Sequence, residues 1–300
     1  MVTIANSLSA ARAAGLDRLD ADLLLLHALH AAVPGKALQR SWLLANDGDL
    51  LTPAVHSHFE QMTQRRCDGE PLAYIVGRKE FFGLDLKVDP RVLVPRPDTE
   101  VLVEWALACL DRQLARQTDK VLRLLDLGTG SGAIALAIKK GRPQVAVDAV
   151  DASPDALMLA RSNASALGLD LQWLQGSWFE PVRQRYDVIV SNPPYIEDGD
   201  PHLSALAYEP IQALTSGPDG LHDIRQIISG ATGHLAAGGW LLLEHGYDQG
   251  PRVRTLLQTA GLQNVTARHD LGGHWRCSGG QYKGDDPEML GSCTTPCTGR

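Results

Sequence analysis

The segment VLRLLDLGTGSGAIALAIKK, residues 121–140, decides the fold class of this chain. It runs from an apolar strand through a loop with alternating glycines into a helix. Glycine lets the backbone turn sharply and lets a ligand approach without obstruction by a Cβ atom, and a helix start offers unpaired N–H groups at a positive end. The segment therefore predicts a site for a nucleotide-like cofactor, cradled by Gly128, Thr129, Gly130, Ser131 and Gly132.

Apolar strands and amphipathic helices alternate from this segment onward. The predicted strands cover residues 121–126, 145–150, 171–174, 186–191, 240–245, 265–269 and 275–278, and the predicted helices cover 133–140, 154–167, 222–237 and 249–260. Such alternation is typical of a doubly wound α/β sheet with helices on both faces. The expected fold is a seven-stranded, Rossmann-like α/β domain.

The rest of the chain falls into segments with different patterns of apolar and polar residues. Residues 1–72 place apolar side chains at helical spacing and predict a small helical-bundle domain. Residues 73–97 partly alternate apolar and polar side chains and predict a β-hairpin linker. The α/β domain then covers residues 98–280, and the polar residues 281–300 are expected to form a disordered tail.

Composition and charge narrow the class of partner. The chain has 300 residues with 28 Lys plus Arg and 35 Asp plus Glu, which gives a net charge of −7. An acidic chain is a poor default binder of nucleic acid, because neutralising phosphates needs clustered cations. Five scattered cysteines are typical of reduced thiols in a cytosolic protein, and no apolar run is long enough to span a bilayer. We expect a cytoplasmic protein with no bound metal, no membrane segment and no direct nucleic-acid partner.

Two carboxylates accompany the glycine loop. Asp151 closes the next strand and can accept hydrogen bonds from both ribose hydroxyls, in a dinucleotide or in another nucleoside cofactor. Its alternative role, capping the following helix, suits Ser153 better because a proline follows that serine. Asp126 either orients the loop or lies near the charged end of the cofactor, and both roles stay open.

A second element, Asn192-Pro193-Pro194-Tyr195, follows the strand at 186–191. Ligands of open α/β sheets bind outside the carboxyl ends of the strands, so this tetrapeptide should face the glycine loop. An amide nitrogen is a weak nucleophile because its lone pair is delocalised. Two acceptors that hydrogen-bond to its N–H groups can localise and orient that lone pair. The Asn192 side chain and the Pro193 carbonyl supply those acceptors, the prolines stiffen the turn, and Tyr195 offers a flat face to a planar amide. The pattern favours methyl transfer to such a nitrogen and disfavours an NAD-dependent dehydrogenase.

Further motifs give the sequence a family resemblance that covers nearly all of residues 1–280. It resembles the HemK-type peptide chain release factor glutamine methyltransferases. Beyond the two elements above, the motifs that carry the resemblance are PLAYIVG (71–77), EFFGL (80–84), VLVPRPDTE (92–100), DPHL (200–203), YEP (208–210) and LLEHG (242–246).

The resemblance implies a five-helix N-terminal domain that helps hold a release factor, followed by a methyltransferase domain. It implies that S-adenosyl-L-methionine contacts Gly128 to Gly132, Asp151, Asn192 and Trp178, with Trp178 near the adenine. Asn192, Pro193, Pro194 and Tyr195 would hold the glutamine of a Gly-Gly-Gln motif in the release factor, with Asn192, Pro193 and Tyr195 as the catalytic residues. Ser177 departs from the family, in which an acidic residue precedes the tryptophan.

Three rival functions are compatible with parts of the sequence. A ribosomal-protein glutamine methyltransferase would share the fold, the cofactor and the tetrapeptide. An adenine-N6 methyltransferase acting on DNA or RNA would need a basic groove, which the acidic N-terminal residues 1–70 do not offer. A non-catalytic binding module would have a damaged loop or tetrapeptide, and both are intact.

Several further residues have two open roles. Asp98 or Thr99 is expected to cap a helix that runs to about Leu114. Glu244 and His245 end a predicted strand at the edge of the site, where they either line the cofactor pocket or bond to loop backbone groups.

Two more features of the sequence concern the substrate. Arg96 is a candidate substrate contact. Gly279-Gly280-Gln281 matches the target motif by coincidence, because it falls at the last expected strand.

Overall fold

A computed structural model describes residues 2–33, 38–116 and 120–284 of the chain. Contacts between residues divide the chain into two compact units. Unit 1 contains Met1–Glu80, Asp85–Val94 and Pro201–Pro210, and unit 2 contains Phe81–Leu84, Pro95–Asp200 and Ile211–Arg300. The glycine loop and the Asn-Pro-Pro-Tyr turn both belong to unit 2.

Unit 1 is a helical bundle, as its apolar spacing predicts. Its helices are α1 (Ile4–Ala13), α2 (Arg18–Ala32), α3 (Arg40–Ala45), α4 (Pro53–Cys67) and α5 (Leu72–Val76). Side chains of Thr3, Asp17 and Thr52 cap the first, second and fourth helices by accepting a backbone N–H. Their apolar faces bury one shared core that includes Leu24 and Phe59.

The predicted hairpin is present as β1 (Arg78–Phe81) and β2 (Leu84–Lys87), which pair with each other. Residues 73–76, which the sequence assigned to the linker, instead belong to helix α5. Gly77 ends that helix with a φ of 71°, the left-handed conformation common after a helix end. A helix of five residues is too short to produce a recognisable apolar period, so the sequence pattern could not reveal it.

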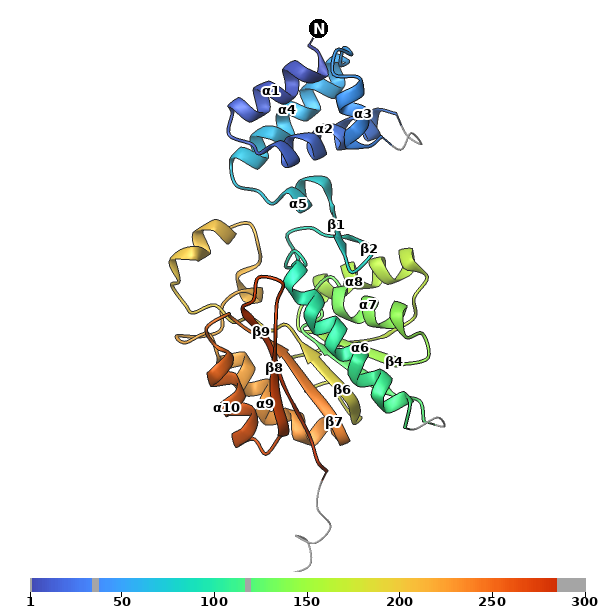
Figure 1. The fold of residues 1–300 in the computed structure, drawn as a ribbon, viewed down its shortest axis with the longest axis vertical. Coiled ribbons are helices and arrows are strands. Elements are labelled where there is room, and N and C mark those ends of the chain that lie inside the picture. Colours follow the sequence, from blue (N-terminus) through green and yellow to red (C-terminus); the bar gives the residue numbers. More distant parts are fainter. Residues whose placement is uncertain (1, 34–37, 117–119, 285–300) are drawn as a thin grey trace, which may run out of the picture. The chain divides into compact units, whose positions relative to one another are not determined.

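Unit 2 contains the seven-stranded sheet that the alternating pattern predicts (Figure 1). Its strands are β3 (Arg123–Leu127), β4 (Ala146–Asp151), β5 (Gln172–Gln175), β6 (Tyr186–Ser191), β7 (Leu235–Glu244), β8 (Gln263–His269) and β9 (Trp275–Gln281). They lie in the order β5-β4-β3-β6-β7-β9-β8. Neighbours from β5 to β7 run parallel, whereas β9 is antiparallel to both β7 and β8. The strand order therefore reverses direction between β3 and β6, which is where ligands of such sheets bind.

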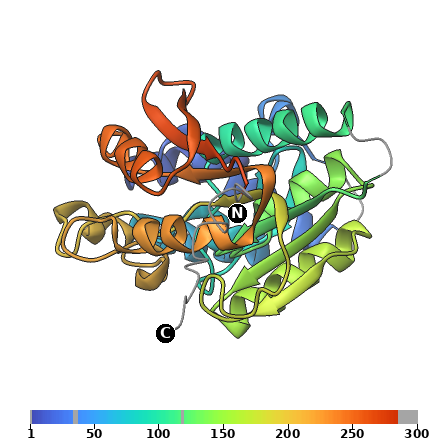
Figure 2. The same ribbon diagram turned by 90° about the horizontal axis from the view of Figure 1, so that it is seen from below.

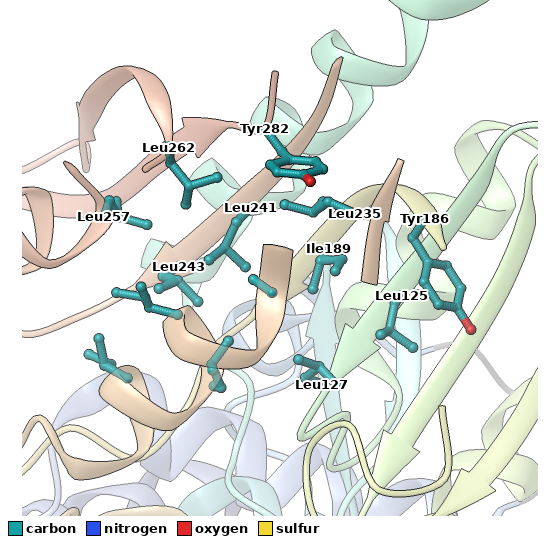
Figure 3. Close-up of a cluster of buried hydrophobic side chains, with 14 of the residues drawn as sticks. Leu125, Leu127, Tyr186, Ile189, Leu235, Leu241, Leu243, Leu257, Leu262 and Tyr282 are labelled. Carbon is teal, nitrogen blue, oxygen red and sulfur yellow. The ribbon is translucent and has the colours of Figure 1, made fainter. Parts of the chain in front are cut away.

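Helices cover both faces of this sheet (Figures 1 and 2). They are α6 (Glu100–Leu114), α7 (Ala133–Gly141), α8 (Pro154–Leu167), α9 (His222–His234) and α10 (Gly250–Thr259). Helices α9 and α10 bury Ile227 and Val253 against Leu241 and Leu243 of β7, and Figure 3 shows these leucines within the buried cluster. Alternate residues of β7 point to the opposite face, which helix α6 covers.

The end of α9 differs from the prediction. The sequence predicts a helix over residues 222–237, but α9 stops at His234 and β7 begins at Leu235. Leu235 pairs with Tyr186 of β6, and both side chains lie in the same buried cluster (Figure 3). The pairing partner is 49 residues away, so local spacing alone favours the helix.

The C-terminal strand accounts for Gly279 and shortens the predicted tail. A Cβ atom on Gly279 would lie 2.6 Å from Leu242 and 2.8 Å from the Leu241 carbonyl, so close packing requires glycine there. Gln281 is the last residue of β9, and the next residue, Tyr282, is buried and donates its N–H to the Gly239 carbonyl. The tail thus starts later than residue 281, and residues 285–300 lie outside the described part of the chain.

Candidate functional site

The glycine loop and the Asn-Pro-Pro-Tyr turn leave neighbouring parallel strands at the same edge of the sheet. Leu127, the last residue of β3, is in register with Ser191, the last residue of β6. The Ser191 hydroxyl donates a hydrogen bond of 2.7 Å to the Leu127 carbonyl and ties the two strand ends together. Gly128 and Asn192 therefore start side by side, as the sequence predicts for two elements at the carboxyl edge.

Each glycine of the loop meets a backbone requirement. Gly128, Gly130 and Gly132 have φ values of 72°, 55° and 83°, a left-handed region that other residues adopt at a cost. A Cβ atom on Gly132 would lie 3.0 Å from Leu136, whereas nothing described lies within 4 Å of the corresponding position at Gly130. The space over Gly130 can therefore receive a ligand close to the backbone.

Asp126 orients the loop, which was one of its two open roles. One carboxylate oxygen accepts the Thr129 hydroxyl at 2.7 Å and the Ala135 N–H at 3.2 Å. The other oxygen is buried and has no hydrogen-bond partner among the described residues. Burial raises the pKa of this carboxyl to about 7, and the neighbouring Asp151 adds to the rise.

Asp151 stands at the end of β4 and contacts the loop from the next strand. Its carboxylate accepts the N–H groups of Gly130 at 2.8 Å and Ser153 at 2.9 Å, and burial raises its pKa. Ser153 caps α8 by accepting the Ala156 N–H, so the capping role belongs to the serine as expected. The carboxylate remains available at the strand end for the predicted contact with ribose hydroxyls.

Trp178 lies against the same loop. A Cβ atom on Gly128 would come within 3.3 Å of the indole ring, so the ring packs on the loop backbone. The Trp178 backbone has a φ of 44°, a positive value that residues other than glycine rarely adopt. The preceding Ser177 donates its N–H to the Glu180 carboxylate at 3.1 Å, so an acidic side chain is present three residues further on.

The backbone of the Asn-Pro-Pro-Tyr turn is fixed by groups from other segments. The Tyr195 carbonyl accepts a hydrogen bond of 2.9 Å from the Gln249 side chain at the start of α10. The Tyr195 N–H donates to the Leu214 carbonyl at 3.1 Å, and Pro193 is buried. Burial raises the pKa of the Tyr195 hydroxyl, so it stays protonated at neutral pH.

The side chain of Asn192 is held separately from the backbone. Its amide nitrogen donates to the Thr99 hydroxyl at 3.2 Å and also to the Glu244 carboxylate. Thr99 donates to Glu244 as well. Glu244 and Thr99 are buried, and burial raises the pKa of Glu244 to about 7.

The partners of Glu244, His245 and Thr99 can be compared with the roles expected from the sequence. Glu244 contacts a residue of the turn, whereas the neighbouring His245 bonds to Gly246 and Ser278 and has its pKa lowered by burial. Thr99 precedes α6 but makes no side-chain cap, so the predicted capping role is wrong for this hydroxyl. Sequence reasoning missed Gln249 altogether, because no local pattern marks a side chain that reaches a turn 54 residues away.

The residues present fit an adenosyl cofactor. The backbone over Gly130 is open, Asp151 offers carboxylate oxygens for ribose hydroxyls, and Trp178 offers a flat surface for a base. Within residues 2–33, 38–116 and 120–284 there is no group of three or more His, Cys, Asp or Glu side chains that could hold a metal ion. In the same ranges no helix is both long enough and apolar enough to traverse a membrane.

Comparison with known proteins gives the family. A model of the methyltransferase small domain matches residues 105–217, and a model of the PrmC N-terminal domain matches residues 4–77. The release factor glutamine methyltransferase of Bordetella pertussis is 47% identical over 270 residues, which cover 89% of this chain and 95% of the relative. The enzyme of the same name from Vibrio cholerae is 47% identical over 88% of this chain and 90% of its own length.

The chain belongs to the release factor glutamine methyltransferase family. The family resemblance, the methyltransferase fold and the use of S-adenosylmethionine expected from the sequence are thereby confirmed. A solved structure of the human METTL16 catalytic domain has the same fold, with a TM-score of 0.56 at 16% identity over 84% of this chain and 95% of that chain.

Proposed function

We propose that this enzyme methylates the side-chain amide nitrogen of a glutamine in the Gly-Gly-Gln motif of a peptide chain release factor. Its relatives in Bordetella pertussis and Vibrio cholerae are release factor glutamine methyltransferases, which supports this substrate. We further propose that the enzyme works in the cytoplasm, where release factors act, and that it needs no direct contact with nucleic acid or membrane.

The observation that carries the proposal is the register between β3 and β6. Because Leu127 pairs with Ser191, the residues that follow them, Gly128 and Asn192, begin at adjacent positions. In this arrangement the cofactor would be held by Gly128, Thr129, Gly130, Ser131, Gly132, Asp151, Asn192 and Trp178. The glutamine would be held by Asn192, Pro193, Pro194 and Tyr195.

The chemistry follows from the properties of an amide. When bound, the cofactor supplies an electrophilic methyl group on a sulfonium. The amide nitrogen of glutamine is a poor nucleophile because its lone pair is delocalised onto the carbonyl. Acceptance of its two N–H bonds by the Asn192 side-chain oxygen and the Pro193 carbonyl would hold the nitrogen in line with the methyl group, and positioning of this kind supplies a large part of the rate. Transfer would form the N–CH₃ bond as the bond between the methyl carbon and sulfur breaks, leaving a neutral thioether, and one N–H proton would be released to solvent.

Unit 1 would serve substrate recognition. The match of residues 4–77 to a family-specific N-terminal model supports a dedicated role for this bundle, beyond the methyl transfer itself. We propose residues 1–76, which end with α5, as the domain that helps hold the release factor, residues 77–97 as a linker and residues 98–280 as the catalytic domain.

Mass spectrometry of a purified release factor tests the proposal. Incubation with the enzyme and S-adenosylmethionine should add a single methyl group, which fragmentation should place on the glutamine of Gly-Gly-Gln. A release factor with that glutamine replaced by alanine is the matched control and should stay unmodified. Methylation of ribosomal protein in place of release factor, under the same conditions, would refute the proposed substrate.

A further inference from the structure

Glu244 is a buried carboxylate at the edge of the site. It is the last residue of β7, the residue is 1% exposed, and Oε2 has no hydrogen-bond partner among the described residues. Burying an ionisable group destabilises the fold unless hydrogen-bond or charged partners compensate for the lost water. Its partners here are the Thr99 hydroxyl and the Asn192 amide, so its surroundings connect it with the turn that receives the target glutamine.

The directions of these hydrogen bonds follow from which groups can donate. An ionised carboxylate only accepts, so Thr99 gives its single hydroxyl proton to Glu244. The Thr99 oxygen is then an acceptor for the Asn192 nitrogen, 3.2 Å away. The Asn192 nitrogen donates to Thr99, and its interaction with Glu244 favours the ionised carboxylate. The Asn192 amide therefore presents its nitrogen, and not its oxygen, to Thr99 and Glu244.

The orientation of the amide is fixed as a result. An amide rotated by 180° would point its oxygen at a carboxylate and at a hydroxyl oxygen whose proton is already committed. Two oxygens with lone pairs facing one another repel, so the network selects one orientation. In that orientation Asn192 Oδ1 points away from Thr99 and Glu244, on a side chain that is partly exposed while both partners are buried.

We propose that Thr99 and Glu244 are positioning residues, which lock the Asn192 amide so that its oxygen, and not its nitrogen, faces the incoming amide of the substrate. The inference rests on the proposed function, since it concerns the same transfer. Neither residue touches the substrate in this proposal. Both act through Asn192, because a substrate N–H needs an acceptor and the opposite orientation would present a donor.

Thr99 does not cap α6. It is the last residue of a short 3-10 helix, Pro97–Thr99, that leads into α6, and its own backbone is helical, with a φ of −65°. An N-cap residue needs a non-helical backbone. The Thr99 hydroxyl is therefore not committed to the helix start and is directed to Glu244, 145 positions later in the chain.

The charged groups around Glu244 have opposing effects on its ionisation. The guanidinium of Arg276 on β9 favours the ionised form, and this arginine also pairs with Asp98 at 3.2 Å and with Asp270 at 3.0 Å. The carboxylate of Asp98 disfavours the ionised form of Glu244. Glu244 in turn adds to the rise that burial causes in the pKa values of Tyr195 and Cys277. The positive charge of Arg276 thus helps keep an acceptor-only carboxylate behind Asn192.

Two isosteric substitutions test the lock. Thr99→Val and Glu244→Leu remove the acceptors without leaving large cavities, and each should slow single-turnover methyl transfer roughly 10- to 100-fold, the effect of losing one or two hydrogen bonds. Cofactor affinity, measured by calorimetry, should stay within about 3-fold of the wild type, since neither residue lies in the glycine loop. Thr99→Ser retains the hydroxyl and should recover most of the rate. Thr232→Val, the same change at a half-buried position in the last turn of α9, is the matched control and should leave the rate unchanged.

A double-mutant cycle separates positioning from general structural support. In an Asn192→Ala background the orientation of residue 192 no longer matters, so adding Thr99→Val should slow the residual transfer less than about 2-fold. An undiminished effect in that background would overturn the proposal, and so would wild-type transfer rates in both single variants. A wild-type enzyme that leaves the release factor unmodified would instead refute the proposed function.

The lock can also be tested without substrate. The side-chain NH₂ signals of Asn192 in a ¹⁵N–¹H spectrum can be assigned by their loss in Asn192→Ala. They should shift and exchange faster with water in Thr99→Val, and return toward wild-type values in Thr99→Ser. Unaltered Asn192 signals in Thr99→Val would show that the amide does not depend on this hydroxyl, whatever the substrate is.

Discussion

The glycine loop and the Asn-Pro-Pro-Tyr turn leave adjacent strands, but they are held in place in different ways. The loop is fixed by nearby residues: Asp126 bonds to Thr129 three positions away, and Asp151 bonds to Gly130 21 positions away. The Asn192 side chain of the turn is fixed by Thr99, 93 positions earlier, and by Glu244. A cofactor loop can thus be encoded within one strand–helix–strand unit, whereas a substrate turn depends on several parts of the domain.

This difference has a physical cause. A loop that binds a common cofactor mainly offers backbone N–H groups, and glycine with a positive φ is enough to direct them. A turn that aims one amide nitrogen must fix the rotation of a side chain, and only other side chains can do that. Substitutions in the two elements should therefore affect different steps of the reaction.

The largest effect is expected at the acceptor itself. Asn192→Ala should lower the rate of methyl transfer by about 10²- to 10³-fold, similar to the loss of one preorganised hydrogen-bonding group in other active sites. Cofactor affinity should change far less. Single-turnover kinetics and calorimetric titration on one preparation would measure both, and a parallel loss of rate and affinity would contradict the division between loop and turn.

Displacing the turn from a distant position should have the next largest effect. A Cβ atom on Gly220 would lie 2.3 Å from the Tyr195 carbonyl oxygen and 2.7 Å from the Gln249 side-chain nitrogen. Gly220→Ala should therefore shift the turn and slow transfer roughly 10- to 100-fold, because small misplacements of a reacting group are costly.

Gly199→Ala is the control for this substitution. Gly199 also has a positive φ, 81°, but has nothing described within 4 Å of its Cβ position. Its replacement should cost only the strain of a left-handed backbone, about 1 kcal/mol of stability. Equal rates for the two variants would show that the contact with Tyr195 does not hold the turn.

A change in the loop should affect cofactor binding first. Asp151→Ala removes the acceptor for Gly130 and the proposed partner of the ribose hydroxyls, so affinity should fall by about 1–3 kcal/mol. Transfer at saturating cofactor should fall less. Isothermal titration measures the affinity, with Asp155→Ala, an exposed position in the first turn of α8, as the control. An unchanged affinity would leave Asp151 only the structural role of holding Gly130.

The last expected effect is on stability and not on the rate of transfer: a pH dependence of the free energy of unfolding that originates at Glu244. Burial raises the pKa of Glu244 from 4.5 to about 7, with Arg276, Asp98, Tyr195 and Cys277 as its charged or titratable neighbours. Between about pH 4.5 and 7, Glu244 therefore keeps a proton in the folded protein that it has lost in the unfolded chain.

The contribution of Glu244 to the free energy of unfolding is therefore fully present below about pH 4.5. It is lost as pH rises toward 7, at a rate on the order of 1 kcal/mol per pH unit. Urea unfolding of the wild type and Glu244→Gln across pH 5–8 measures it, because the variant should lack this part of the slope. The same substitution at the exposed Glu104 is the control, and a wild-type slope in Glu244→Gln would assign the effect elsewhere. Methyl transfer should show the opposite trend and rise with pH through 7, as the acceptor-only carboxylate forms.

Local chemistry allowed much of unit 2 to be predicted. Helix α8 has the predicted limits because Ser153 and Pro154 mark its start and Gly168, with a φ of 65°, ends it. Strand β6 also has the predicted limits, because all six of its residues are apolar or buried. The predicted end of α9 was wrong because Leu235 has apolar spacing suited to a helix but pairs with a distant strand.

The sequence by itself determined the family, the α/β fold, the glycine loop and the turn, because these depend on backbone conformation and residue types over short stretches. The tertiary structure alone decided which side chains hydrogen-bond to the Asn-Pro-Pro-Tyr turn. Thr99, Glu244 and Gln249 come from three different elements, and nothing near any of them in the sequence points to Asn192 or Tyr195. Hydrogen bonds between side chains depend on which strand ends meet in space, and the order and register of the strands fix that only once the sheet has formed.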